Sequence, residues 1–164
     1  MRRLLGFFVL LAVGIYGVAA AKTPPVIFVS EGGSLGVELQ VSADRLRVDL
    51  LNSSDRAIKV NKRFLYGTES GWTDLVLVVQ DEGGNILPYL TKATSERPRP
   101  EDWCYLSPGN FVGKSIPLKR LKADYGLENK MYTVKVEYLI RSKKGELLSR
   151  LSSPSVSVSF QLDE

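Results

Sequence analysis

Residues Pro108–Ser115 carry the Gly-Lys-Ser sequence found in phosphate-binding loops. Such a loop places four residues between its first glycine and the Gly-Lys-Ser, and a helix starts beneath it to complete the phosphate site. Here three residues separate Gly109 from Gly113, and the following Ile116-Pro117-Leu118 cannot open the required helix. The spacing therefore predicts a turn that leads into a strand, and no nucleotide cofactor.

The segment Asp81-Glu82-Gly83-Gly84-Asn85 offers three oxygen-bearing side chains around two glycines, as a calcium loop does. A calcium loop also needs a bidentate glutamate downstream, and Ala93 or Thr94 stands at that distance. The same residues form a common hairpin turn. We therefore expect a turn without a metal.

The absence of histidine and the single cysteine limit the chemistry of the chain most sharply. They exclude Ser-His and Cys-His nucleophile pairs and make a structural zinc site untenable. No serine has a lysine three residues later, and acidic side chains such as Glu38 and Asp49 occur singly. Cys104 is expected to be a small buried apolar group, with an intermolecular disulfide or a redox-sensitive thiol as alternatives. These features predict a non-catalytic protein without a cofactor.

The best candidate for a recognition surface is the aperiodic segment Thr91–Asp102, which contains three basic residues and two prolines. Arginine and tryptophan are frequent interface anchors, and proline lowers the cost of ordering a loop. The basic cluster at 119–122 is interpreted as a solvated corner, and Trp72, which precedes an apolar run, as part of the core. The predicted partner-binding residues are Lys92, Arg97, Arg99 and Trp103.

The segments that must position these residues have the period-two alternation of β-strands. Apolar residues alternate with polar ones over 37–41, 45–50 and 132–138, and 75–79 is an unbroken apolar run typical of a covered central strand. One helical turn is expected at 119–124. Further strands are expected at 58–64, 86–90, 111–118 and 156–162. The spacing predicts an all-β sandwich of about seven or eight antiparallel strands. The core residues expected are Leu46, Val48, Leu50, Leu75, Leu77, Tyr132, Val134 and Val136.

The first 21 residues have the layout of a secretory signal peptide. Arg2 and Arg3 precede the apolar run Leu4–Val18, and three alanines at 19–21 end it. Cleavage after Ala21 would leave one domain, 22–164, without a membrane span, in the periplasm or outside the cell. An uncleaved anchor is the alternative. Without the two arginines the net charge falls from +4 to +2, so no nucleic-acid partner is expected.

The run from Asp124 to Val136 resembles the strand-entry region of immunoglobulin-like domains. Tyr132 resembles their tyrosine-corner residue, with Val134 where those domains commonly have a cysteine. The chain is thus similar to single-domain immunoglobulin-like proteins exported by bacteria. That resemblance implies an immunoglobulin-like sandwich and a role in protein interaction or in the cell envelope.

Some proteins of that broad group inhibit proteases through loops at one end of the domain. Arg97-Pro98 and Trp103 faintly resemble an inhibitory loop of chagasin-type inhibitors, whose Asn-Pro-Thr-Thr-Gly segment has no counterpart here. Two functions are therefore predicted. The first is an exported protein-interaction module, and the alternative is an inhibitor of an exported protease acting through residues 91–102.

Overall fold

The computed structural model describes residues 35–42, 44–92 and 96–160 of the 164-residue chain. These residues form nine strands, one α-helix and one short 3-10 helix, so the expectation of a β-rich fold with antiparallel sheets is confirmed. The predicted signal peptide at 1–21 and part of the 91–102 segment lie outside the described residues.

The first sheet contains three antiparallel strands in the order β1-β2-β6. Strand β1 (Leu35–Val41) pairs with β2 (Arg45–Asn52), and β2 pairs on its other side with β6 (Phe111–Pro117). The alternation in β2 buries Leu46, Val48 and Leu50 on one face, while Arg45 and Arg47 are exposed on the other.

The second sheet is built around the long strand β7 (Met131–Arg141). Strand β4 (Leu75–Gln80) pairs along one side of β7. Strands β8 (Leu147–Ser152) and β9 (Val156–Ser159) follow one another along the other side. Between them, Ser153 keeps contact with β7, since its amide donates to the Val136 carbonyl at 2.8 Å and its hydroxyl accepts from the Val136 amide at 3.0 Å.

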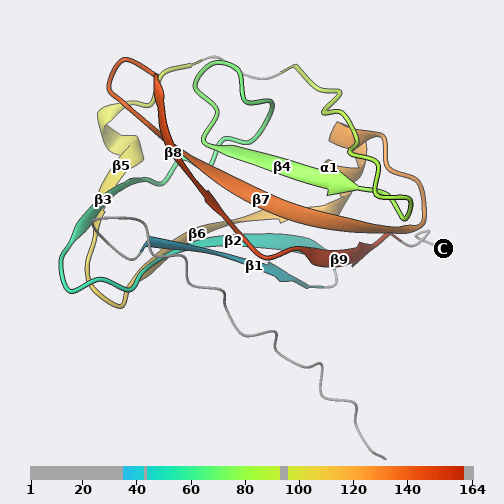
Figure 1. The fold of residues 1–164 in the computed structure, drawn as a ribbon, viewed down its shortest axis with the longest axis horizontal. Helices are drawn as coiled ribbons and strands as arrows, with labels where there is room; N and C mark the ends of the chain where they lie inside the picture. The colour runs from blue at the N-terminus through green and yellow to red at the C-terminus, as the bar shows by residue number, and fades with distance from the viewer. Residues whose placement is uncertain (1–34, 43, 93–95, 161–164) are drawn as a thin grey trace, which may run out of the picture.

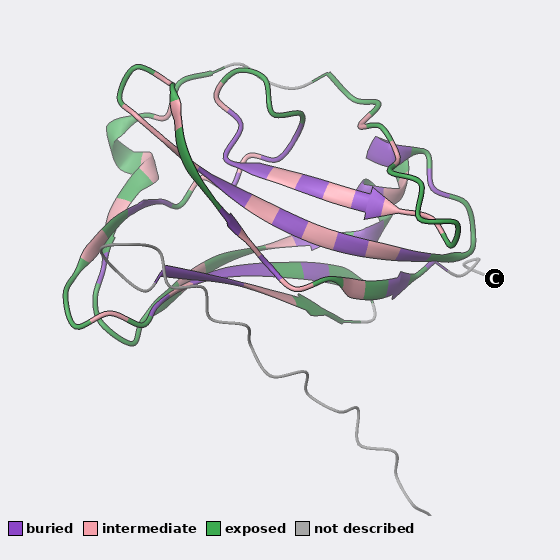
Figure 2. Cartoon of the chain, in the orientation of Figure 1, coloured by how far each residue is buried: buried purple, intermediate pink, exposed green. Residues whose placement is uncertain are grey.

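The two sheets lie in separate layers, with β4 and β7 above β1, β2 and β6 in Figure 1. Along β4 and most of β7, buried residues alternate with less buried ones (Figure 2), so one face of each strand is directed into the core. The expected core is confirmed, because every residue predicted for it is at most 3% exposed: Leu46, Val48, Leu50, Leu75, Leu77, Tyr132, Val134 and Val136.

Three local predictions were wrong in detail. The run 75–79 is not a central strand covered on both faces, because Val76 and Val78 are only half-buried and β4 stands at the end of the order β4-β7-β8. In the predicted strand 86–90, Ile86 forms a single bridge with Gln80, the last residue of β4. No strand forms over the rest of 86–90. The helix α1 (Leu118–Tyr125) has two turns and ends at Gly126, whose φ of +63° suits a residue without a side chain. Strand β8 was not anticipated.

The connection from α1 into β7 is fixed by a tyrosine. Tyr132, the second residue of β7, is buried, and its hydroxyl accepts a hydrogen bond from the Glu128 amide at 3.0 Å. Its ring packs edge-on against Phe160. The side chain therefore ties the turn before β7 to the core.

A third, two-stranded ribbon stands at one end of the molecule (Figure 1). It joins β3 (Ile58–Asn61) to β5 (Trp103–Leu106), which follows the 3-10 helix η1 (Pro100–Asp102). Cys104 lies on β5, half-buried and packed against the core. No helix within the described part of the chain could cross a membrane.

Candidate functional site

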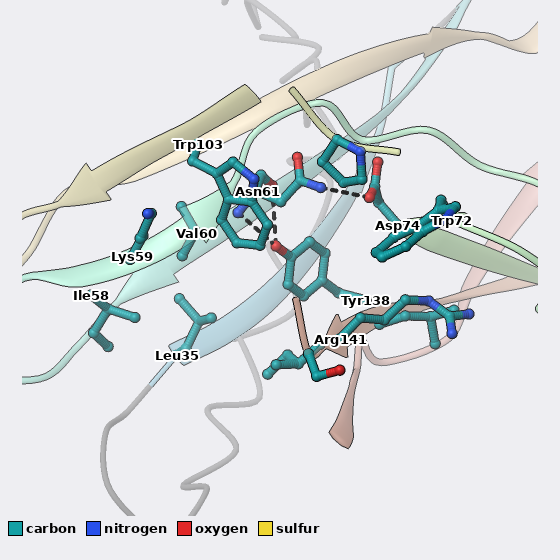
Figure 3. Close-up of a pocket in the computed structure, with 14 residues that line it drawn as sticks. Leu35, Ile58, Lys59, Val60, Asn61, Trp72, Asp74, Trp103, Tyr138 and Arg141 are labelled. Carbon is teal, nitrogen blue, oxygen red and sulfur yellow. Dashed lines mark hydrogen bonds between the residues drawn. The ribbon is translucent and has the colours of Figure 1, made fainter. Parts of the chain in front are cut away.

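A hollow of about 160 Å³ opens between the β3–β5 ribbon and the end of β7 (Figure 3). Its walls come from segments far apart in the sequence, and most of the lining side chains are apolar. The residues are Leu35, Ile58, Lys59, Val60, Asn61, Trp72, Asp74, Pro98, Trp103, Tyr138, Leu139, Ile140, Arg141 and Ser142.

Tyr138 forms part of the floor of the hollow, between Trp103 and Trp72 in the view of Figure 3. Its hydroxyl accepts from the Asn61 amide at 3.0 Å and donates to the Asn61 carbonyl at 3.1 Å. Burial raises the pKa of Tyr138, so the hydroxyl stays neutral and keeps both bonds at physiological pH. These two hydrogen bonds hold β3 against β7.

The buried carboxylate of Asp74, beside Tyr138, accepts four hydrogen bonds. Oδ1 of Asp74 accepts from Nδ2 of Asn61 at 2.7 Å and Nη2 of Arg63 at 3.0 Å. Oδ2 accepts from Nε of Arg63 and the amide of Leu65, both at 2.8 Å. The side chains of Arg63 and Asp74 are 16% and 6% exposed, so this is a buried, two-point ion pair.

The same network holds the turn that follows β3 in an unusual conformation. Phe64 is fully buried and has a φ of +51°, a left-handed value that bulky side chains rarely adopt. The flanking amides are fixed, since Arg63 donates to Oδ1 of Asn61 at 2.9 Å and Leu65 donates to Asp74. The carboxylate thus compensates for backbone strain at the edge of the hollow.

Both tryptophans of the chain lie on the wall of the hollow, and each carries a cation over its ring. The Arg97 guanidinium lies 5.2 Å from the centre of the Trp72 ring, and Nζ of Lys59 lies 5.6 Å from that of Trp103. Trp72 also packs against Gly145, where a Cβ atom would approach the ring to 2.9 Å. Gly145 thus allows the β7–β8 turn to lie against the ring.

The rim of the hollow carries positive charge that no described carboxylate neutralises. Arg141 donates to the carbonyls of Glu69, Thr73 and Gly145. Across the described ranges, no ion pair joins Lys59, Arg97 or Arg141 to a carboxylate.

Three acidic residues near the rim are already engaged. Asp74 pairs with Arg63, and Oδ2 of Asp102 accepts from the Arg99 amide at 2.7 Å. Glu101 lies 4.0 Å from Arg99. Lys59, Arg97 and Arg141 therefore place three cations without a described carboxylate partner around a mostly apolar hollow.

The structure brings together two of the four residues predicted as partner-binding. Trp103 lines the hollow, and Arg97 lies on its rim over Trp72. Arg99 is exposed beside Glu101 and does not line the hollow. Lys92 is also exposed, and its neighbour Thr91 is bound to Asp124, at the corner formed by α1.

Several residues of the hollow were missed by the sequence interpretation. Trp72 was assigned to the core, and Lys59, Asn61, Tyr138 and Arg141 were not considered for the site. A weak signal existed in Arg141, which ends the strongest alternating strand just before a turn. Nothing in the sequence places Trp72 and Trp103 together.

The other segments with possible chemistry form turns. Asp81 accepts from the amide and Nδ2 of Asn85, and these bonds lower the pKa of Asp81. Gly109 precedes β6 with a φ of +72°, and Gly113 and Lys114 lie within that strand, as expected for a turn leading into a strand.

No protein-family model matches the chain, and no curated protein matches it.

Proposed function

We propose that the chain is an exported, non-catalytic immunoglobulin-like domain that binds a protein partner through the hollow. The observation that carries this proposal is a mostly apolar hollow, flanked by both tryptophans and by three cations that form no ion pair with a described carboxylate. Tryptophan and arginine are the side chains that most often anchor protein interfaces.

The strand order supports an immunoglobulin-like fold. In immunoglobulin constant-type domains one sheet contains strands A, B, E and D, and the other contains C, F and G. Here β1-β2-β6 corresponds to A-B-E, and β4-β7-β8 corresponds to C-F-G. The hydrogen bond from the Glu128 amide to the hydroxyl of Tyr132 has the form of a tyrosine corner at the start of strand F.

Export is supported by the sequence. The two arginines, the apolar run and the three alanines occur in the order that a signal peptide requires. Removal of this segment leaves a 143-residue domain, which is large enough to fold around one core without a disulfide.

The hollow favours binding of a side chain over binding of a metabolite or catalysis. Small-molecule sites commonly measure about 300–1,000 Å³, whereas a cavity of about 150 Å³ takes a single benzene ring. The polar groups of the floor, those of Asn61, Asp74 and Tyr138, are hydrogen-bonded to one another or to the protein. A side chain inserted there would meet an apolar wall, as interface anchors do.

The conformation near the hollow supports a binding module over a protease inhibitor. An inhibitor that enters a protease cleft needs an extended loop, but Pro100–Asp102 form a 3-10 helix closed by the bond from the Arg99 amide to Asp102. The Glu96 carbonyl is held by Nη1 of Arg63 at 2.7 Å. The Asp102 carbonyl accepts from the Lys62 amide at 2.7 Å, so both ends of residues 96–102 are fastened to the domain.

The test is capture of a partner from the exported fractions of the source cell, compared between variants of the mature domain. Trp103→Ala should weaken capture at least about tenfold, or roughly 1.4 kcal/mol. Ile86→Ala is the matched control, because Ile86 is 66% exposed and lies outside the hollow. A thermal midpoint for each variant shows that it is folded. Equal capture by Trp103→Ala and wild type would refute the proposal.

A further inference from the structure

The shape and charge of the hollow specify the chemistry of its partner further than the proposed function does. The volume of about 160 Å³ suits one side chain, and the bonded floor leaves no polar group that favours a polar occupant. The wall includes Leu35, Ile58, Val60 and Ile140. A leucine, methionine or phenylalanine side chain would therefore be the best occupant.

The charged residues around the hollow determine which partner residues are favoured next to the inserted side chain. Lys59, Arg97 and Arg141 surround it without a described carboxylate partner, as noted above. Their charges would attract carboxylates within about one Debye length, roughly 10 Å at 0.1 M salt. Lysine or arginine at the same places in a partner would be repelled.

The exposed face of the β3–β5 ribbon indicates along which surface a partner segment would run. Tyr105 is 73% exposed and lies two residues along β5 from Trp103, so the two aromatic side chains share one face. Lys59 is opposite Tyr105 across the ribbon. A segment anchored in the hollow would extend over these three side chains.

We propose that the hollow binds an acidic segment of a partner protein, with one apolar side chain inserted and carboxylates against Lys59, Arg97 and Arg141. This inference rests on the proposed function, because it specifies the partner of the same site. It commits to an acidic partner, whereas the function requires only that a protein binds there.

The two tryptophans make the inference directly measurable, because both line the hollow and the chain has no others. The probe is an acetylated and amidated peptide, Ser-Asp-Glu-Leu-Asp-Glu-Ser, titrated to about 1 mM against the mature domain. One comparison peptide replaces the leucine by alanine, and a second replaces the four acidic residues by lysine. None contains an aromatic residue, so the tryptophan emission reports on the protein alone.

The acidic leucine peptide should change the emission saturably, and both comparison peptides should bind at least tenfold more weakly. Arg97→Gln should weaken binding severalfold and reduce its salt dependence. Arg45→Gln is the matched control, since Arg45 is an exposed arginine that pairs with Asp44 and lies outside the hollow.

Equal binding of the lysine and acidic peptides, equal binding of the alanine peptide, or no binding of the acidic peptide would overturn the inference. These failures are distinguishable from failure of the proposed function. If partner capture still depends on Trp103, the hollow binds a protein of other chemistry. If capture does not depend on Trp103, the proposed function is wrong as well.

Discussion

Replacement of Asp74 by alanine should be among the most damaging single changes outside the apolar core. The substitution removes four hydrogen bonds and leaves the guanidinium of Arg63, only 16% exposed, without its counter-charge. Removing one member of a buried ion pair typically costs about 3–5 kcal/mol, because the remaining charge stays buried and unpaired. The amide of Leu65 also loses its acceptor beside the strained Phe64.

The magnitude depends on burial rather than on the presence of an ion pair, and the chain offers a matched control. Arg150 and Glu69 also form a pair, but their side chains are 40% and 50% exposed. Solvent screens such a pair, so Glu69→Ala should cost no more than about 1 kcal/mol. The cost of Asp74→Asn should lie between the costs of Asp74→Ala and Glu69→Ala, because the asparagine keeps one acceptor oxygen but loses the charge.

Equilibrium unfolding of residues 22–164 in urea, followed by far-ultraviolet circular dichroism, measures these differences. Asp74→Ala should lower the midpoint much more than Glu69→Ala, with a similar denaturant dependence. If Asp74→Ala fails to fold, the double substitution Arg63→Met with Asp74→Leu provides the test. The double substitution removes both charges, so it should lower stability less than Asp74→Ala alone. Equal, small losses for Asp74→Ala and Glu69→Ala would refute the reasoning.

Three further results are expected. Gly113→Ala should lower the free energy of unfolding in urea by about 1–3 kcal/mol, because the added Cβ would lie 1.8 Å from Oδ1 of Asp49. Gly36→Ala should be nearly neutral, because its Cβ would meet only one atom, at 4.0 Å. Equal effects of the two substitutions would contradict this. Tyr132→Phe should cost about 1 kcal/mol because the Glu128 amide loses its acceptor, and an unchanged midpoint would argue against the bond. Burial raises the pKa of three tyrosines, so these side chains ionise in the unfolded chain before they ionise in the folded one. Stability should therefore fall as the pH rises above about 10, and the urea midpoint should fall with it. A urea midpoint that does not change with pH would be inconsistent with their burial. The three tyrosines are Tyr66, Tyr125 and Tyr138.

The β-rich core was predictable because period-two alternation is local. In β2 and β7 every second residue is apolar, and one face of each strand is buried. Strand β8 was missed for the opposite reason. Its sequence, Leu-Leu-Ser-Arg-Leu-Ser, has no clean alternation, and Leu148 is 65% exposed. The strand exists because β7 presents an edge to it, which is a tertiary cause.

The candidate site was only partly predictable because pairings between distant segments create it. The composition of residues 91–102 drew attention to Arg97 and the adjoining Trp103, both of which lie at the hollow. Trp72 joins them through two distant contacts, Arg97 over its ring and Gly145 against it. No local pattern encodes such a meeting, so Trp72 was interpreted as a core residue.

The same contacts between distant segments order the hollow in advance, as the proposed binding requires. Trp72 is fixed between the β7–β8 turn and the 96–102 segment, and that segment is fastened through Arg63 to the Asp74 network. A binding surface whose anchors are already ordered loses less conformational entropy on association. Damage to Asp74 should therefore weaken partner capture beyond the loss of folded protein, because it frees the segment that carries Arg97. Comparing capture per folded molecule for Asp74→Asn and Glu69→Ala separates this effect from stability, and equal capture would mean that the network supports the fold alone.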